Sequence, residues 1–91
     1  MRYMWDPAKQ KANIEKHGLD FSLAERIINA TAMRDVVDDR TDKNYGEERH
    51  LAYAEVNGVK LCLCYVSREP DIIRPISLRR AHEKEWRKLK W

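Results

Sequence analysis

The sequence has no long apolar run, no repeat and few residues that break secondary structure. No stretch of about 18 or more apolar residues occurs, which excludes an ordinary membrane-spanning helix. Residues 1–7 lack the apolar core of a signal peptide, so we expect a cytoplasmic protein without membrane contact. Only 3 Gly and 3 Pro occur among 91 residues, and no low-complexity linker divides them. These absences predict one small domain over residues 1–91.

Cysteine is also scarce. Cys62 and Cys64 lie two residues apart in a predicted strand, where both side chains point to the same side and are badly placed for a mutual disulfide. The nearby sequence does not supply the four ligands of a structural zinc site. We therefore expect two small buried apolar residues in a reducing compartment, with no metal and no cofactor.

The positive charge is concentrated at the C-terminus. The chain has 18 Lys and Arg against 15 Asp and Glu, a net charge of +3. Between Arg74 and Trp91 there are 7 basic residues and 2 Glu, so this segment alone carries about +5. Such a segment indicates a polyanion or an acidic protein as the partner.

The first 30 residues predict a helical hairpin. Asp6 is a good N-cap and Pro7 suits the first helical position, so a helix is expected to run to Lys16 or His17 and to stop at Gly18. Ser22 and Glu25 have the spacing of a capping box, which predicts a second, short helix that ends near residue 29.

The rest of the chain predicts an antiparallel sheet and a final helix. Asn57-Gly58 is a strong hairpin signal, and Val59, Leu61, Leu63 and Tyr65 should share one strand face. Pro75 requires an edge position or a bulge, and Ser77 should cap a helix over 78–89. The fold class is α+β, with about four to five strands, an N-terminal helical hairpin and a C-terminal helix. The expected strands are 2–5, 33–39, 49–56, 59–67 and 72–77.

Three dispersed segments resemble one family in the right order. Trp5–Gly18, Tyr45–Arg49 and Ile76–Ala81 are similar to the opening, central and closing motifs of BrnT-type toxins. Pro75 and Ala54 depart from the family pattern, which usually has an apolar residue and a glycine there. The resemblance implies the toxin of a type II toxin–antitoxin pair with a RelE-like ribonuclease fold. It also implies a BrnA-like antitoxin with a ribbon-helix-helix domain, through which the toxin reaches operator DNA.

RNA cleavage without a metal needs a base for the 2′-hydroxyl proton, cations for the charge on phosphorus oxygens, and an acid for the leaving 5′-oxygen. The candidates are His17, Glu48, Arg49 and Arg79. Arg79 is expected near a helix start, where its guanidinium fork matches phosphate. We expect it to converge with Arg49 in one shallow basic cleft.

Each candidate also has a purely structural interpretation. Arg79 could close a surface ion pair with Glu83 or Glu85, and Arg49 could pair with a glutamate beside it. His17 could simply cap a helix C-terminus. The other two histidines, His50 and His82, match no motif and are predicted to lie on the surface.

Further residues are predicted to bind RNA or a protein. Trp86 and Trp91 lie beside basic residues on a helix with few apolar positions, which favours an interface with the antitoxin or with a second copy of the chain. Lys9, Asn13 and Lys16 should share one polar helix face, which is equally typical of an ordinary wet surface. The expected RNA-binding residues are Lys9, Lys16, Arg68 and Arg80.

Three functions remain open on this basis. The first is a ribonuclease toxin that is neutralised by an antitoxin. The second is a non-catalytic nucleic-acid-binding or co-repressor module, and the third is a toxin of the same fold that acts on another target such as gyrase. The availability of His, Glu and several Arg favours the first, although a fold alone does not determine a function.

Overall fold

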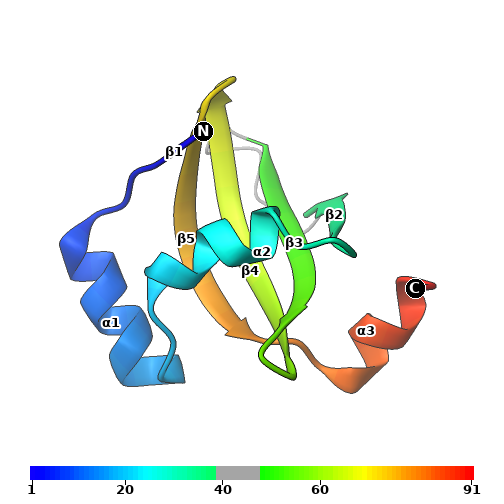
Figure 1. Cartoon of the computed structure of the whole chain (residues 1–91). Helices are drawn as coiled ribbons and strands as arrows, with labels where there is room; N and C mark the ends of the chain where they lie inside the picture. Colours follow the sequence, from blue (N-terminus) through cyan, green and yellow to red (C-terminus); the bar gives the residue numbers. More distant parts are fainter. Residues whose placement is uncertain (39–47) are drawn as a thin grey trace.

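The computed structural model describes residues 1–38 and 48–91, apart from the side chain of Arg68. A single five-stranded sheet has the order β1-β5-β4-β3-β2, antiparallel throughout except that β1 runs parallel to β5 (Figure 1). The predicted α+β class is confirmed. Of the helices in the described ranges, none has the length and apolar character to cross a membrane. The elements are β1 (Arg2–Tyr3), α1 (Pro7–His17), the 3-10 turn η1 (Phe21–Leu23), α2 (Ala24–Ile28), β2 (Arg34–Val37), β3 (Arg49–Val56), β4 (Val59–Glu69), β5 (Ile72–Arg80) and α3 (Glu83–Lys88).

The first helix begins and ends as predicted, whereas the cap of the second does not. The Asp6 carboxylate accepts from the Ala8 N–H at 2.8 Å, and Gly18 ends α1 with a left-handed φ of 70°. Ser22 was the wrong cap. Asp20 accepts from the Ser22 N–H at 2.9 Å and opens η1 ahead of α2. The Gln10 amide holds the Asp20 carboxylate in place at 2.6 Å, so a contact with α1 decides which residue caps.

The central hairpin agrees with its sequence signal. Asn57 and Gly58 have φ angles of 52° and 78°, as a two-residue turn between twisted strands requires. The pairing of β3 with β4 is regular from Val56 opposite Val59 to Arg49 opposite Val66. Opposed residues share a face of the sheet, so this register fixes which side chains of β3 and β4 lie together.

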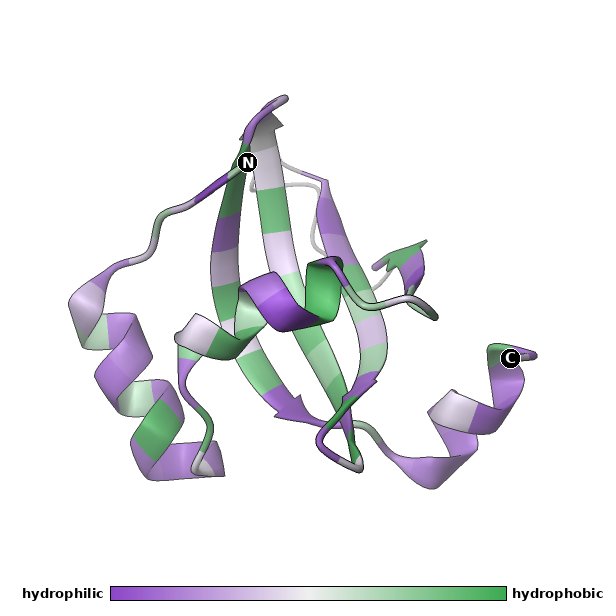
Figure 2. Cartoon of the chain, viewed as in Figure 1, coloured by the Kyte–Doolittle hydropathy of each residue, from purple (hydrophilic) through white to green (hydrophobic). Residues whose placement is uncertain are grey.

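The main core lies between the sheet and the helical segment η1–α2. Phe21, Ala24 and Ile27 are fully buried against the sheet, and each large apolar side chain buried in this way stabilises the fold by about 1.5–3 kcal/mol. Figure 2 shows the alternation of hydrophobic and hydrophilic residues along the central strands that produces this face. The predicted strand face is confirmed. Its members in β4 are Val59, Leu61, Leu63 and Tyr65.

The C-terminal part differs from the prediction. Strand β5 continues to Arg80 instead of ending at residue 77, and α3 spans only Glu83–Lys88. Leu78 is fully buried opposite Leu63, so the alternation of a strand continues where a helix was expected. Ser77 pairs with Cys64 and caps nothing. As a consequence, Arg79 and Arg80 point to opposite faces of a strand and do not begin a helix.

The position of Pro75 in β5 is compatible with its lack of a backbone N–H. Tyr65 opposes Pro75 and Cys64 opposes Ser77, so Ile76 is an extra residue and β5 is bulged there. Strand β1 pairs with β5 only at Ile72 and Ile73, so Pro75 lies beyond the end of β1. The prediction of an edge position or a bulge is confirmed.

The Asn13 side chain is buried and does not belong to a solvent-exposed surface. Its Nδ2 donates to the Leu78 carbonyl at 2.9 Å, and its Oδ1 accepts from the Leu78 N–H at 2.9 Å. Nδ2 also donates to the Leu19 carbonyl at 2.9 Å. The predicted polar stripe is therefore wrong for Asn13, because the amide replaces a neighbouring strand along this edge of β5.

We expect Asn13→Ala to lower the free energy of unfolding by about 2–3 kcal/mol, because it leaves buried polar groups of Leu78 unsatisfied. Urea denaturation measures the change. Glu15→Ala, on an exposed position of the same helix, is the matched control and should change stability by less than about 0.5 kcal/mol. Equal losses in the two variants would contradict this role of Asn13.

Candidate functional site

The site is built around one carboxylate on the face of the sheet opposite α2. Glu85 of α3 accepts from Arg79 Nη1 at 2.7 Å and from Arg79 Nη2 at 3.0 Å. It also accepts from the Tyr53 hydroxyl of β3 and, at 2.8 Å, from the backbone N–H of His82. This carboxylate joins β3, β5 and α3. The ion pair between Arg79 and Glu85 that the sequence allowed is present, and both side chains are mostly buried, with 24% and 22% exposed.

The electrostatics of this cluster follow from burial and hydrogen bonding. Burial by itself raises the pKa of Glu85, but the bonds from Arg79, Tyr53 and His82 outweigh it and lower that pKa to about 2. The hydrogen bond to Glu85 raises the pKa of Arg79, and burial followed by the bond to Glu85 raises the pKa of Tyr53. Near neutral pH, Glu85 is therefore an anion and Arg79 a cation.

An open pocket of about 680 Å³ lies beside this cluster. Arg79 donates three hydrogen bonds, two to Glu85 and one to the Arg80 carbonyl. A guanidinium has five N–H groups, so the Nε–H and one Nη2–H have no partner among the described residues. Together with two lysines of α3 they form a basic pocket suited to a phosphate. The lining residues are Leu51, Tyr53, Arg79, His82, Lys84, Glu85 and Lys88.

Arg49 lies on the same face of the sheet as Arg79 but not in the same pocket. Arg49 opposes Val66, and Arg79 opposes Cys62, four residues away along β4. At about 3.3 Å per residue, the two arginines are separated by about 13 Å along the strands. The shared face agrees with the expectation of one basic surface, but Arg49, which is half-buried, does not line the pocket at Arg79, so convergence of the two in one cleft stays a prediction. Arg74 opposes Val66 from the other side, so the basic surface extends along the sheet.

The other two predicted catalytic residues, His17 and Glu48, lie outside the Arg79 pocket. His17 ends α1, which packs along β5, and within the described ranges its ring makes no hydrogen bond or ion pair. Glu48 is exposed, and its Oε2 lies 3.2 Å from the Nε2 of His50. Neither residue lines the pocket at Arg79.

His50 was wrongly placed on the surface. It is half-buried, its Nδ1 lies 3.0 Å from the Asp35 carboxylate, and its ring stacks on Tyr65 at 5.3 Å. Tyr65 also donates to Asp35. The cause is strand alternation, because His50 shares its face with Ala52, Ala54 and Val56 of the core. The period of β3 could have revealed this, yet this face is opposite the one that carries Arg79.

The predicted RNA-binding residues lie outside the pocket. Lys9, Lys16 and Arg80 are exposed and belong to other surfaces. The side chain of Arg68 and residues 45–47 of the central motif are outside the described residues. Sequence reasoning missed Lys84, Lys88 and Tyr53. The i, i+4 spacing of Lys84 and Lys88 was a usable signal once the start of α3 was known.

The two C-terminal tryptophans have different positions. Trp86 packs against the small core of Leu51, Tyr53 and Cys62 and so attaches α3 to the sheet. Trp91 stacks on Trp86 with ring centroids 4.3 Å apart, and Arg34 lies 5.0 Å above the Trp91 ring. Trp91 remains 41% exposed. Of the two, Trp91 is the more exposed, and its place in a protein interface stays a prediction.

Neither cysteine lines the pocket at Arg79. Cys62 is buried, burial raises the pKa of its thiol to about 11, and no disulfide joins it to half-buried Cys64. Within residues 1–38 and 48–91, no group of three or more His, Cys, Asp or Glu side chains is arranged to hold a metal ion.

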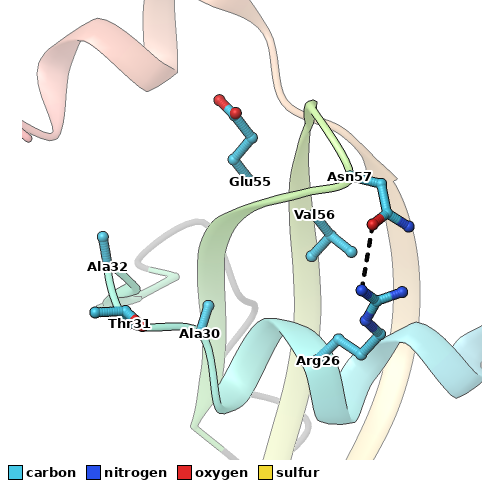
Figure 3. A pocket seen from close by; sticks show the side chains of 7 residues that line it. All are labelled: Arg26, Ala30, Thr31, Ala32, Glu55, Val56 and Asn57. Carbon is cyan, nitrogen blue, oxygen red and sulfur yellow. Dashed lines mark hydrogen bonds between the residues drawn. The ribbon is translucent and has the colours of Figure 1, made fainter.

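A second open pocket, of about 360 Å³, lies on the other side of the hairpin (Figure 3). Arg26 donates to the Asn57 side chain at 3.2 Å, while Glu55 points away from that pair. Val56 and the small side chains of residues 30–32 form the rest of its wall. Its charged groups do not converge, so it is a weaker candidate for chemistry than the pocket at Arg79.

Comparisons with known proteins concern the domain as a whole. The family model described as the ribonuclease toxin BrnT of type II toxin–antitoxin systems matches residues 5–85, which include Arg79 and Glu85. The crystal structure of the Brucella abortus ribonuclease toxin BrnT is similar, with a TM-score of 0.65 and 28% sequence identity. The match covers 91% of this chain and 99% of that one. Among curated proteins, none matches the sequence significantly.

The low pKa of Glu85 predicts how stability depends on pH. Because its folded pKa of about 2 lies below the ordinary 4.5, its stabilisation is complete above pH 4.5 and is lost as the pH falls toward 2. We expect Glu85→Gln to cost about 2–3 kcal/mol at pH 7, and the difference from the unmodified protein to shrink through that window. Urea denaturation at several pH values measures it.

Glu83→Gln is the matched control. Glu83 is exposed and lies 3.4 Å from Lys60, so this change should cost less than about 0.5 kcal/mol at every pH. A cost of Glu85→Gln that stayed constant down to pH 2 would contradict the shifted pKa.

Proposed function

Because this chain belongs to the BrnT family of type II ribonuclease toxins, we propose that it is itself an endoribonuclease that cleaves RNA at the Arg79 pocket without a metal. One observation carries the proposal. Within the region that matches the family, a guanidinium keeps two N–H groups available in a pocket that two lysines also line. A single RNA phosphate is a ligand of suitable charge and geometry for these groups.

Glu85 acts as a positioning residue in this proposal. Its two oxygens already accept four hydrogen bonds, and its pKa of about 2 makes it a poor acceptor for a substrate proton. It holds the Arg79 guanidinium in one plane with the remaining N–H groups outward. Such preorganised donors stabilise the charge that develops on the phosphorus oxygens during attack.

Residues at the rim of the pocket carry out the proton transfers in this proposal. The 2′-oxygen forms a bond to phosphorus while its proton passes to the imidazole of His82, and the bond from phosphorus to the 5′-oxygen breaks. The departing 5′-oxygen takes a proton from the ammonium group of Lys84 or Lys88. The products are a 2′,3′-cyclic phosphate and a 5′-hydroxyl end.

The other predicted residues have supporting roles. Arg49 and Arg74 share the face of Arg79 at a distance, so they are suited to neighbouring phosphates of a bound strand rather than to the scissile one. Lys9, Lys16 and Arg80 are exposed cations outside this face, and their effect on RNA binding should be smaller.

The proposed partner is a BrnA-like antitoxin with a ribbon-helix-helix domain, through which the complex reaches operator DNA. An acidic segment of that antitoxin would neutralise the toxin by covering the Arg79 pocket. Trp91, which is 41% exposed next to this pocket's helix, supplies an aromatic anchor of the kind that dominates protein interfaces.

We expect Arg79→Ala to reduce cleavage of a single-stranded RNA by about 100-fold or more, because the oriented donors are lost. The assay contains EDTA and identifies the ends of the fragments. Arg79→Lys keeps the charge without the fork and should remain strongly impaired. Arg26→Ala, on α2 across the sheet, is the matched control and should cleave normally. Cleavage that requires added metal, or fragments with 3′-hydroxyl ends, would contradict the proposed reaction.

Two histidine variants test the proton acceptor. His82→Ala should lower the rate of cleavage by about 100-fold, because the proposed proton acceptor is lost. His17→Ala should retain most of the activity, since His17 does not line the pocket. The reverse result would assign the proton transfer to His17.

A further inference from the structure

The opposite face of the sheet carries a small pocket of different chemistry. It has a volume of about 130 Å³ and is lined by Tyr3, Trp5, Phe21, Ser22 and Glu25. Phe21 belongs to the core under α2, whereas Arg79 opposes Cys62 of the small core under α3. The two pockets therefore open on different sides of the molecule.

The walls of this pocket are aromatic and fixed. Trp5 and Phe21 meet edge to face, with ring centroids 6.2 Å apart and planes at 78°. Phe21 is fully buried, and Tyr3 and Trp5 pack against the same core. Because core packing holds these rings, the pocket exists before any ligand arrives, and little ordering is needed on binding.

The polar groups of the pocket include a carboxylate without an ion-pair partner and a hydroxyl without a hydrogen-bond partner among the described residues. Glu25 forms no ion pair within the described residues, although its charge, after the effect of burial, contributes to raising the pKa of Tyr3. The Tyr3 hydroxyl is buried and has no hydrogen-bond partner among those residues. The Tyr3 hydroxyl is covered by protein atoms, so the groups that a ligand can reach are the Glu25 carboxylate and the aromatic rings. A carboxylate and electron-rich rings favour a cation that carries N–H donors.

We propose that this pocket binds the guanidinium group of an arginine presented by a partner protein. A guanidinium is flat, stacks on aromatic faces and donates in pairs to a carboxylate, which matches Trp5, Tyr3 and Glu25 better than an ammonium group does. A phosphate would be repelled by Glu25. The site is thus complementary to the Arg79 pocket: one side of this chain attracts anions and the other a cationic side chain. The inference does not depend on RNA cleavage.

The probe is N-acetyl-arginine amide, titrated into the purified chain and followed by two-dimensional NMR. We expect the Trp5 indole N–H and the amides of Phe21 and Ser22 to shift, while the indoles of Trp86 and Trp91 stay constant. N-acetyl-citrulline amide has nearly the same shape without the charge and should cause no comparable shift. Spermidine tests a free polyamine as the source of the cation and should bind more weakly than the arginine probe.

Variants locate the binding. Glu25→Gln should weaken binding of the arginine probe by about 10-fold or more, a loss typical of removing one charged partner. Tyr3→Phe retains the ring and should weaken it less. Glu55→Gln removes the same charge from the pocket of Figure 3 and should have no effect. Melting curves establish that all variants fold, and RNA cleavage should be unchanged in each of them.

Several results would overturn the proposal. Equal shifts with the citrulline compound would show that charge is not recognised, and an unchanged affinity in Glu25→Gln would place the binding elsewhere. Tighter binding of spermidine would make the ligand a polyamine. Tighter binding of a nucleoside monophosphate would make this a base pocket instead. None of these outcomes bears on Arg79→Ala, so the two proposals stand or fall separately.

Discussion

The arrangement of the basic face depends on the four hydrogen bonds that converge on the Glu85 carboxylate. Tyr53 donates from β3, Arg79 from β5 and the His82 backbone from the start of α3, so one side chain holds a six-residue helix against the sheet. A helix of that length has little stability in isolation. The same bonds fix the plane of the Arg79 guanidinium at the wall of the pocket. Fold and proposed chemistry thus share one interaction, since whatever loosens α3 also releases Arg79.

The sheet separates two kinds of surface because successive residues of a strand point to opposite sides. Arg79 faces α3, while its neighbours Leu78 and Arg80 face the other way. Across the sheet, Asp35, His50 and Tyr65 form a hydrogen-bonded group, and Glu25 lies beside Tyr3 in the aromatic pocket. The net charge of +3 does not reveal that basic and acidic groups lie on different faces of the sheet. A polyanion and a cationic partner group can therefore be attracted to different sides of a 91-residue chain.

Local signals predicted the elements that local chemistry governs. Pro7 and Gly18 bounded the first helix, Asn57-Gly58 set the central hairpin, and the alternation of β4 identified the core face. Predictions failed where a distant contact decided the outcome. Asp20 replaced Ser22 as a cap because Gln10 holds it, and residues 78–80 joined β5 because Leu78 is buried opposite Leu63. His50 is a different case, because the alternation of β3 already places it on the core face.

The sequence by itself determined the family, the α+β class and the basic C-terminal segment, since these follow from residue identity and short-range spacing. Only the tertiary structure decided that Arg79 and Tyr53 both donate to Glu85, that Arg49 lies along the sheet from Arg79, and that a carboxylate and three aromatic rings meet on the other side. Each of those facts depends on strand register and helix docking. Register and docking arise from pairing between segments far apart in the chain, which no local pattern specifies.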